Sequence, residues 1–257
     1  MYRWLRRIAI NLGLMFAGAA IALFFLYRAA TAPVPEYQAV LEKTQQQLDS
    51  GELEASRQEL ESQIAAVYSD AAEPVGEDDE NRWETIVTDQ QVNSWLATQL
   101  AVDFPELAEQ GLFEPRVLMQ GGAVIIAVRA ETTGINAVVS LVVRPFIAED
   151  GWLALELASA KIGSAPLPTA HILDQLDGAL GDGGLPGRWG RNDGRPVLLV
   201  DFQEQASSPE YIRSLEAVEV RDGEVYIVGQ TKSRPSRVAT LANRPSGDEP
   251  ILTEPGL

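Results

Sequence analysis

The feature that most constrains this chain is an apolar run close to its N-terminus. Residues Ile8 to Tyr27 contain no charged side chain and one strongly polar one, Asn11. A helix of about 20 residues is about 30 Å long, which matches the hydrocarbon core of a bilayer. Trp4 and Tyr27 lie near the two ends, where aromatic rings prefer the membrane interface. The run therefore predicts a single-pass transmembrane helix with the lipid bilayer as its partner.

The flanking charges predict the orientation of this anchor. Arg3, Arg6 and Arg7 precede the run, whereas Arg28 alone follows it directly. Positive charge stays on the cytoplasmic side, so we expect the N-terminus in the cytoplasm, the anchor in the inner or cytoplasmic membrane, and the main domain outside (periplasmic). A cleaved signal peptide is the alternative, with Ala30 to Ala32 as its best cleavage motif. We favour the anchor because signal peptides carry a shorter apolar region of about 7 to 15 residues.

Composition excludes several classes of function. The net charge of −17 repels phosphate backbones, so we expect no nucleic-acid partner. The chain has no cysteine and one histidine, His171, whereas zinc sites usually recruit two or more such ligands. His171 opens a predicted helix, where a surface or capping role explains it, and no known catalytic motif is present. We therefore expect no metal, no cofactor and no enzymatic activity.

An acidic helical stalk is expected after the anchor. The segments 36–49 and 52–69 carry apolar residues at helical spacing, and the charged stretch 71–81 follows as a linker. These helices could dock on the main domain or form a short coiled coil. We favour a plain amphipathic spacer with a solvated face, because the stretch is too short for a heptad argument. The expected layout is anchor 1–28, stalk and linker 29–82, main domain 83–231 and disordered tail 232–257.

The main domain is expected to begin with a helix and continue as strands. Thr88 and Gln91 form a capping-box pattern ahead of a helix with Leu96 and Leu100 on its apolar face. The period then changes to two over 116–120, 123–131, 135–144 and 152–162, with short turns that require antiparallel pairing. A second helix is expected from position 168 or 169 to about 180, followed by strands at 196–202, 215–220 and 225–228. The predicted class is α+β: a transmembrane helix, a helical stalk, then an antiparallel β-meander with two packed helices.

One stretch resembles a known family. From Val142 to Leu176 a strand enters at Arg144-Pro145-Phe146, turns at Asp150-Gly151, ends at Lys161-Ile162-Gly163, and leads to a helix opened by Leu167-Pro168. With Val87 to Asn93 and the hairpin at Asp222-Gly223, this pattern resembles the YpmS-like family of membrane-anchored bacterial proteins of uncharacterised function, over roughly residues 84 to 230. The resemblance implies an N-anchored extracytoplasmic domain. More distantly it is similar to tubular lipid-binding folds, which implies a strongly curved sheet.

The apolar face of the predicted sheet and helices is the main candidate site. Such residues normally form a core that the helices fill. The alternative is that the two helices leave part of the curved sheet open, as a groove for an acyl chain. The groove residues would be Leu96, Leu100, Val124, Ile126, Val128, Val139, Leu141, Leu155, Leu157, Ile172 and Leu176.

A glycine-rich stretch is a second candidate. Residues 181–194 are expected to form a loop in which Arg188, Trp189 and Arg191 stand among glycines. Tryptophan with arginine suits a membrane surface, so this loop could touch the bilayer. We favour the alternative, a plain flexible loop with Trp189 folded onto the domain, because loops of this length are often merely mobile.

The sequence thus predicts a membrane-anchored extracytoplasmic binding module that contacts a lipid or another hydrophobic ligand of the cell envelope. The alternative is a structural scaffold of the envelope that binds a protein partner and no small molecule.

Overall fold

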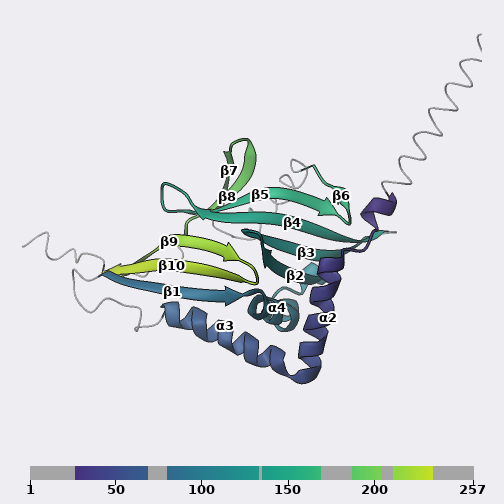
Figure 1. Cartoon of the computed structure of the whole chain (residues 1–257), viewed down its shortest axis with the longest axis horizontal. Coiled ribbons are helices and arrows are strands. Elements are labelled where there is room, and N and C mark those ends of the chain that lie inside the picture. Colours follow the sequence, from purple (N-terminus) through teal and green to yellow (C-terminus); the bar gives the residue numbers. More distant parts are fainter. Residues whose placement is uncertain (1–26, 69–79, 133–134, 169–186, 204–210, 234–257) are drawn as a thin grey trace, which may run out of the picture.

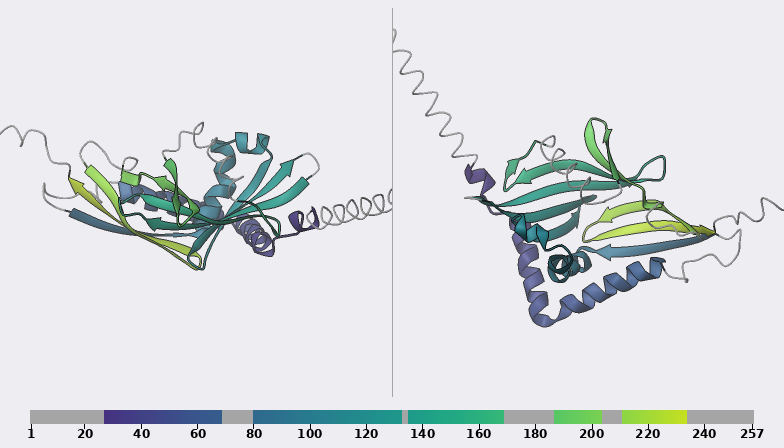
Figure 2. Two further views of the ribbon diagram at one scale, coloured as in Figure 1. Left: turned by 90° about the horizontal axis from the view of Figure 1, so that it is seen from above. Right: turned by 180° about the vertical axis from the view of Figure 1, so that it is seen from behind.

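The computed structural model describes residues 27–68, 80–132, 135–168, 187–203 and 211–233. Four predicted segments fall outside these ranges: nearly all of the anchor, most of the charged linker 71–81, the second helix with Ile172 and Leu176, and the tail beyond Ser233. Among the residues that the structure describes, no helix has both the length and the apolar character needed to cross a bilayer. The described part combines helices with curved antiparallel sheet, as the sequence predicts (Figures 1 and 2).

The larger sheet contains the predicted meander. Its strand order is β2-β3-β4-β5-β8-β7, and each pair of neighbouring strands runs antiparallel. The turn between β2 and β3 falls at Gly121 and Gly122, both with positive φ, as predicted. β2 begins earlier than expected because a bulge at Glu114 and Pro115 lets pairing resume beyond the proline. The four meander strands are β2 (Leu112–Gln120), β3 (Ala123–Thr132), β4 (Ile135–Ile147) and β5 (Leu153–Ile162).

Two segments for which the sequence predicts no strand form strands in the structure. β6 (Ala165–Pro166) pairs with the end of β5. β7 (Gly187–Asn192) pairs with β8 (Arg195–Val200) around a turn at Asp193 and Gly194. The expectation of a glycine-rich loop through 194 is therefore wrong for its second half. The high glycine content suggests a loop, but at Gly187 the glycine is needed for close packing within the sheet. A Cβ at this position would lie 2.9 Å from a methyl carbon of Leu198.

A smaller sheet, which was not expected, completes the domain. It consists of β1 (Glu80–Thr88), β10 (Glu224–Ser233) and β9 (Tyr211–Arg221), in the order β1-β10-β9. The predicted hairpin at Asp222-Gly223 joins β9 to β10. The prediction of a single meander is wrong, because β1 pairs with β10 from the other end of the domain, a long-range contact that no local pattern reveals. β10 also continues through Lys232, which was assigned to the tail.

The helix after β1 forms as predicted. α4 (Asp89–Thr98) starts with a complete capping box: the Thr88 hydroxyl accepts the Gln91 amide N–H at 3.2 Å, and the Gln91 side-chain oxygen accepts the Thr88 N–H at 2.8 Å. Two single turns follow, α5 (Leu100–Asp103) and α6 (Glu106–Glu109). Figure 2 shows α4, α5 and α6 rising from one face of the curved sheet.

The two stalk helices are present but pack against the domain. α2 (Pro35–Ser50) and α3 (Glu52–Tyr68) meet at Gly51, which adopts a left-handed φ of 77°. Tyr37, Leu53 and Leu60 are each at most 7% exposed. α3 runs beside β1 and α4 (Figure 1). Our preference for a solvated spacer is therefore wrong: three well-spaced apolar residues suffice to hold short helices when a surface is available to cover.

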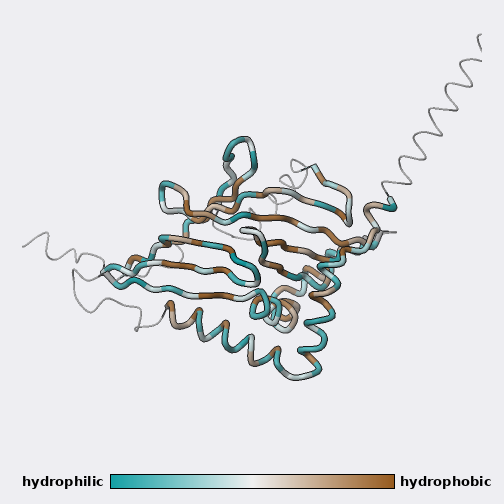
Figure 3. The backbone as a smooth tube through the Cα atoms, viewed as in Figure 1, coloured by the Kyte–Doolittle hydropathy of each residue, from teal (hydrophilic) through white to brown (hydrophobic). Residues whose placement is uncertain are grey.

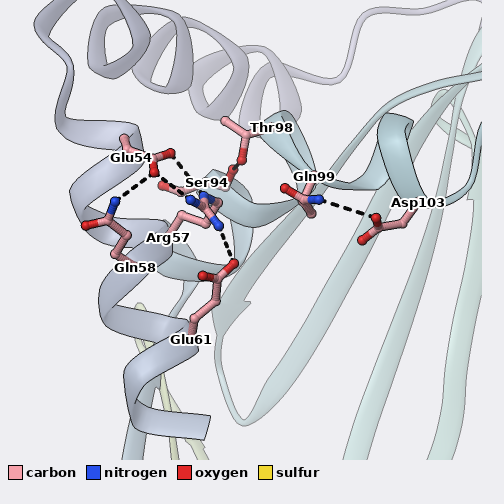
Figure 4. A network of polar contacts seen from close by, with 8 residues as sticks. All are labelled: Glu54, Arg57, Gln58, Glu61, Ser94, Thr98, Gln99 and Asp103. Atoms are coloured by element: carbon pink, nitrogen blue, oxygen red, sulfur yellow. Dashed lines mark hydrogen bonds and ion pairs between the residues drawn. The ribbon is translucent and has the colours of Figure 1, made fainter. Parts of the chain in front are cut away.

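A polar network on α3 lies beside α4, with the Arg57 side chain next to Ser94 (Figure 4). Arg57 donates to the carboxylates of Glu54 and Glu61, one turn away on either side. These hydrogen bonds raise the pKa of the Arg57 guanidinium and lower the pKa of the Glu54 carboxyl. Both ion pairs stay within α3 and involve solvent-exposed carboxylates, and pairs of this kind contribute little to stability. The attachment of α3 to the domain therefore rests mainly on its buried leucines.

Candidate functional site

The register of the larger sheet places the predicted strand residues on one side, which we name the inner face. Residues directly opposite each other in an antiparallel pair point to the same face. The relevant pairs are Val124–Val143, Ile126–Leu141 and Val128–Val139 between β3 and β4, then Val143–Leu157 and Pro145–Leu155 between β4 and β5. All the strand positions predicted for the groove therefore share the inner face: Val124, Ile126, Val128, Val139, Leu141, Leu155 and Leu157.

α4 covers one part of the inner face. Leu96 packs with Val124 against a buried cluster of Val117, Met119 and Val220. Asn93 fixes the helix in this position, since its side-chain amide donates to the Val117 carbonyl at 2.7 Å and accepts the Val117 N–H at 2.8 Å. Sequence reasoning missed Asn93. A polar residue beside the apolar stripe of a helix was the available signal, but its partner on β2 was not predictable.

An apolar groove lies next to this cluster. It has a volume of about 380 Å³ and runs between α4–α6 and the first part of β2. Three of the predicted residues, Leu96, Leu100 and Val128, line it together. We name it the α4–β2 groove, and its other large apolar residues are Phe104, Leu107, Leu112 and Phe113. Phe104 is 46% exposed although it lines the groove, so the groove is open to solvent on the α5–α6 side.

A second apolar hollow lies at the opposite end of the inner face. It measures about 310 Å³ and is enclosed by α3, the smaller sheet and the start of β5. Trp83 and Phe202 form part of its wall, with ring centroids 6.5 Å apart. Pairing of Trp83 with Gly229 leaves room for the indole, because a Cβ on that glycine would overlap the ring. None of the predicted site residues lies in this hollow, which depends on the unexpected pairing of β1 with β10.

The strip between the two hollows is not fully covered by the described residues. Ile126 is 39% exposed at the centre of β3, and Val139 and Leu141 beside it are half-buried. Leu157, by contrast, is buried. Apolar stretches along these strands stand out in Figure 3, whereas α2 and α3 are mainly hydrophilic. Ile172 and Leu176 lie outside the described residues.

Polar groups gather behind the groove, on the outer face. Tyr37 donates its hydroxyl to the Glu114 carbonyl at 2.7 Å, and burial raises the pKa of this tyrosine. Arg116 is 7% exposed, and burial lowers the pKa of its guanidinium. Arg129 lies 5.3 Å from the centre of the Phe113 ring and pairs with the Glu114 carboxylate at 3.0 Å. The groove lining is therefore mainly apolar, with Glu114 and Arg116 of β2 as its charged members.

The predicted membrane-touching residues belong to β7 rather than to a loop. Arg188 lies 4.6 Å from the centre of the Trp152 ring and 3.6 Å from the Asp150 carboxylate. Trp189 is half-buried and Arg191 is exposed. Next to them Asn192 donates to the buried Glu156 carboxylate at 3.1 Å. These contacts tie the hairpin to β5 and to the turn before it, so the structure does not bring this group to the groove.

Metal-binding groups are not gathered in the described part of the chain. Within those residues, no cluster of three or more histidine, cysteine, aspartate or glutamate side chains could hold a metal ion. His171 lies outside the described residues.

Comparisons with protein-family models, with curated proteins and with solved structures find no significant match to this chain. The resemblance to the YpmS-like family therefore stays a prediction that rests on the residues quoted above.

Proposed function

We propose that this protein is a membrane-anchored extracytoplasmic module that binds a lipid or another hydrophobic ligand of the envelope, and that it acts by binding rather than by catalysis. The observation that carries the proposal is the α4–β2 groove, in which Leu96, Leu100 and Val128 come together from separate elements. Its volume of about 380 Å³ lies in the range of small-molecule sites, which are mostly apolar.

The chemistry of the groove favours an acyl chain over a charged ligand. Apart from Glu114 and Arg116, its wall consists of aliphatic and aromatic residues, and an apolar ligand would gain about 0.8 kcal/mol for each buried CH₂ group. The net charge of −17 repels anionic headgroups, so the contact would be mainly hydrophobic. The second hollow and the half-exposed strip around Ile126 offer room for a longer chain on the same face.

The scaffold alternative has weaker support. It would need apolar surface on the stalk for a protein partner, but Tyr37, Leu53 and Leu60 are buried against the domain itself. Leu48 and Ile64 are the exposed large apolar residues of α2 and α3. Ile64 also lines the second hollow, so little continuous apolar surface is left for a partner on these helices.

Native mass spectrometry tests the proposal. A chain beginning at Arg28, which keeps α2 and α3, is purified from cells without detergent. We expect an added mass that corresponds to an acyl lipid, released under denaturing conditions. If the protein shows only its own mass, both as purified and after incubation with envelope lipids, the scaffold alternative is favoured instead.

A groove variant sharpens this test. Leu100→Asp places a charge in the apolar groove, and we expect the bound lipid to fall at least tenfold because burying a carboxylate there is costly. Leu48→Asp is the matched control, since Leu48 is 54% exposed and lies on α2. Equal lipid occupancy in the two variants would contradict the assignment of the groove.

A further inference from the structure

The chain is hydrogen-bonded to the larger sheet at Ala29, only two residues after the predicted anchor ends at Tyr27. The carbonyl oxygen of Ala29 accepts hydrogen bonds from Ser164, from the backbone N–H at 2.9 Å and from the hydroxyl at 3.1 Å. Gly163 makes this approach possible: a Cβ there would lie 2.5 Å from the Ala29 oxygen and 2.4 Å from the Ala30 oxygen. The end of the predicted membrane helix is therefore held beside the β5–β6 turn.

The residues that follow also contact the domain. Pro33, Val34 and Pro35 lie over the outer face of β2–β5, where they wall a hollow of about 340 Å³ with Lys161 and Gly163. Tyr37 then enters the protein, is 2% exposed, and bonds through its hydroxyl to Glu114. Residues 29–37 thus form a strap that holds the end of the predicted anchor against the domain, in place of a free tether.

The strap fixes one particular end of the sheet beside the anchor. The Gly163 N–H donates to the Val138 carbonyl at 2.7 Å, which places the β5–β6 turn beside the start of β4. Two residues before Val138, Asn136 pairs with Glu131 at the end of β3. The Glu131 N–H donates to the Gly111 carbonyl at 2.7 Å, just after α6. Because neighbouring strands lie about 5 Å apart, α6 and the strap are on the same end of the sheet (Figures 1 and 2).

This same end exposes apolar side chains. Val102 is 69% exposed and Phe104 46% exposed, and both belong to the α5–α6 segment that walls the groove. We infer that the α5–α6 segment faces the bilayer and contacts its acyl region, so that the α4–β2 groove opens toward the membrane and receives its ligand from there. The inference rests on the predicted anchor and on the proposed function, and it adds to them an orientation and a phospholipid-bilayer surface as the source of the ligand.

Depth measurements on the full chain in lipid nanodiscs test this orientation. The sequence contains no cysteine, so Val102→Cys and Phe104→Cys each provide a single site for an environment-sensitive fluorophore. Leu48→Cys is the control, because Leu48 is similarly exposed but lies about 16 Å along α2 from Tyr37, the last residue of the strap. We expect nitroxide-labelled phospholipids to quench most of the emission at positions 102 and 104 and to leave position 48 unchanged.

Either of two results would overturn the inference: positions 102 and 104 unaffected by the nitroxide lipids, or quenching equal to that at position 48. Both leave the mass-spectrometric test of lipid binding untouched, so the orientation can fail while the proposed function stands. Conversely, quenching at 102 and 104 without any co-purifying lipid would support the orientation and count against the groove as a ligand site.

Discussion

At the scale of single residues, the absence of one side chain decides how two distant segments of the chain meet. Gly163 and Ser164 join the start of the described chain to the middle of the domain, across 135 residues of sequence. The left-handed φ of 54° at Gly163 and the carbonyl oxygens packed on its Cα both require the absence of a side chain. In the sequence this glycine only marks the end of a predicted strand, whereas in the structure it lets two backbones touch.

Replacing this glycine tests the strap. Gly163→Ala should destabilise the protein more than Gly121→Ala, which has a similar φ of 58° but nothing near its missing Cβ. The control carries only the left-handed penalty of about 1–2 kcal/mol. Overpacking adds about 1–3 kcal/mol at position 163. Urea unfolding measures the free energy of unfolding of both variants. Equal losses would mean that the strap can move away from a Cβ at position 163 without destabilising the protein.

Tyr37 predicts a dependence of stability on pH. Burial raises its pKa above the usual value near 10, so at pH values between the unfolded and folded pKa the native state keeps a proton that the unfolded state has lost. Stability from this group is complete below pH 10 and falls as the pH rises through the folded pKa. Tyr37→Phe should lose about 0.5–1.5 kcal/mol at neutral pH with the hydrogen bond to Glu114, and should show a shallower decline above pH 10. Parallel stability–pH curves for the two proteins would contradict the assignment.

At the scale of elements, local signals explain where α4 begins but not where it docks. The capping box at Thr88 and Gln91 satisfies two backbone N–H groups at the helix start and was readable from four residues. The pair of hydrogen bonds between Asn93 and Val117 then sets the helix on β2, and so fixes one wall of the groove. An error in the helix start would turn Asn93 away from its partner.

Removing the cap tests this coupling. Thr88→Ala should cost about 1 kcal/mol of unfolding free energy, within the range of about 0.5–2 kcal/mol for such caps. Thr98→Ala in the last turn of α4 is the control, because its hydroxyl only bonds back to the Ser94 carbonyl and alanine has the higher helix propensity. Chemical denaturation measures both, and a loss at position 98 as large as at position 88 would rule out a specific role for the cap.

At the scale of the whole molecule, the fold is one curved surface with its apolar face partly lined by helices from distant parts of the chain. The smaller sheet closes one end through the pairing of β1 with β10, and α4–α6 close the other. α2 and α3 pass along the edge and turn the expected stalk into a part of the domain. A groove that spans such an assembly is positioned by all of these contacts together.

Truncation tests the contribution of α2 and α3. A chain that begins at Glu80 should be less stable than one that begins at Arg28, because it loses the buried side chains of Leu53 and Leu60 together with Tyr37. Complete burial of a leucine contributes about 1.5–3 kcal/mol, so the urea midpoint should shift clearly. Identical midpoints would show that the two helices rest on the domain without stabilising it.

The sequence by itself determined the features that depend on neighbouring residues. Alternating apolar positions specified β3, β4 and β5 and put the predicted groove residues on one face, and glycine-containing turns joined β2 to β3 and β9 to β10. Tertiary structure alone decided the pairing of β1 with β10 and the docking of α2 and α3. The physical reason is range: a turn or a cap is stabilised within a few residues, whereas these contacts join segments far apart in the chain, where a local pattern cannot specify which of many apolar surfaces will meet.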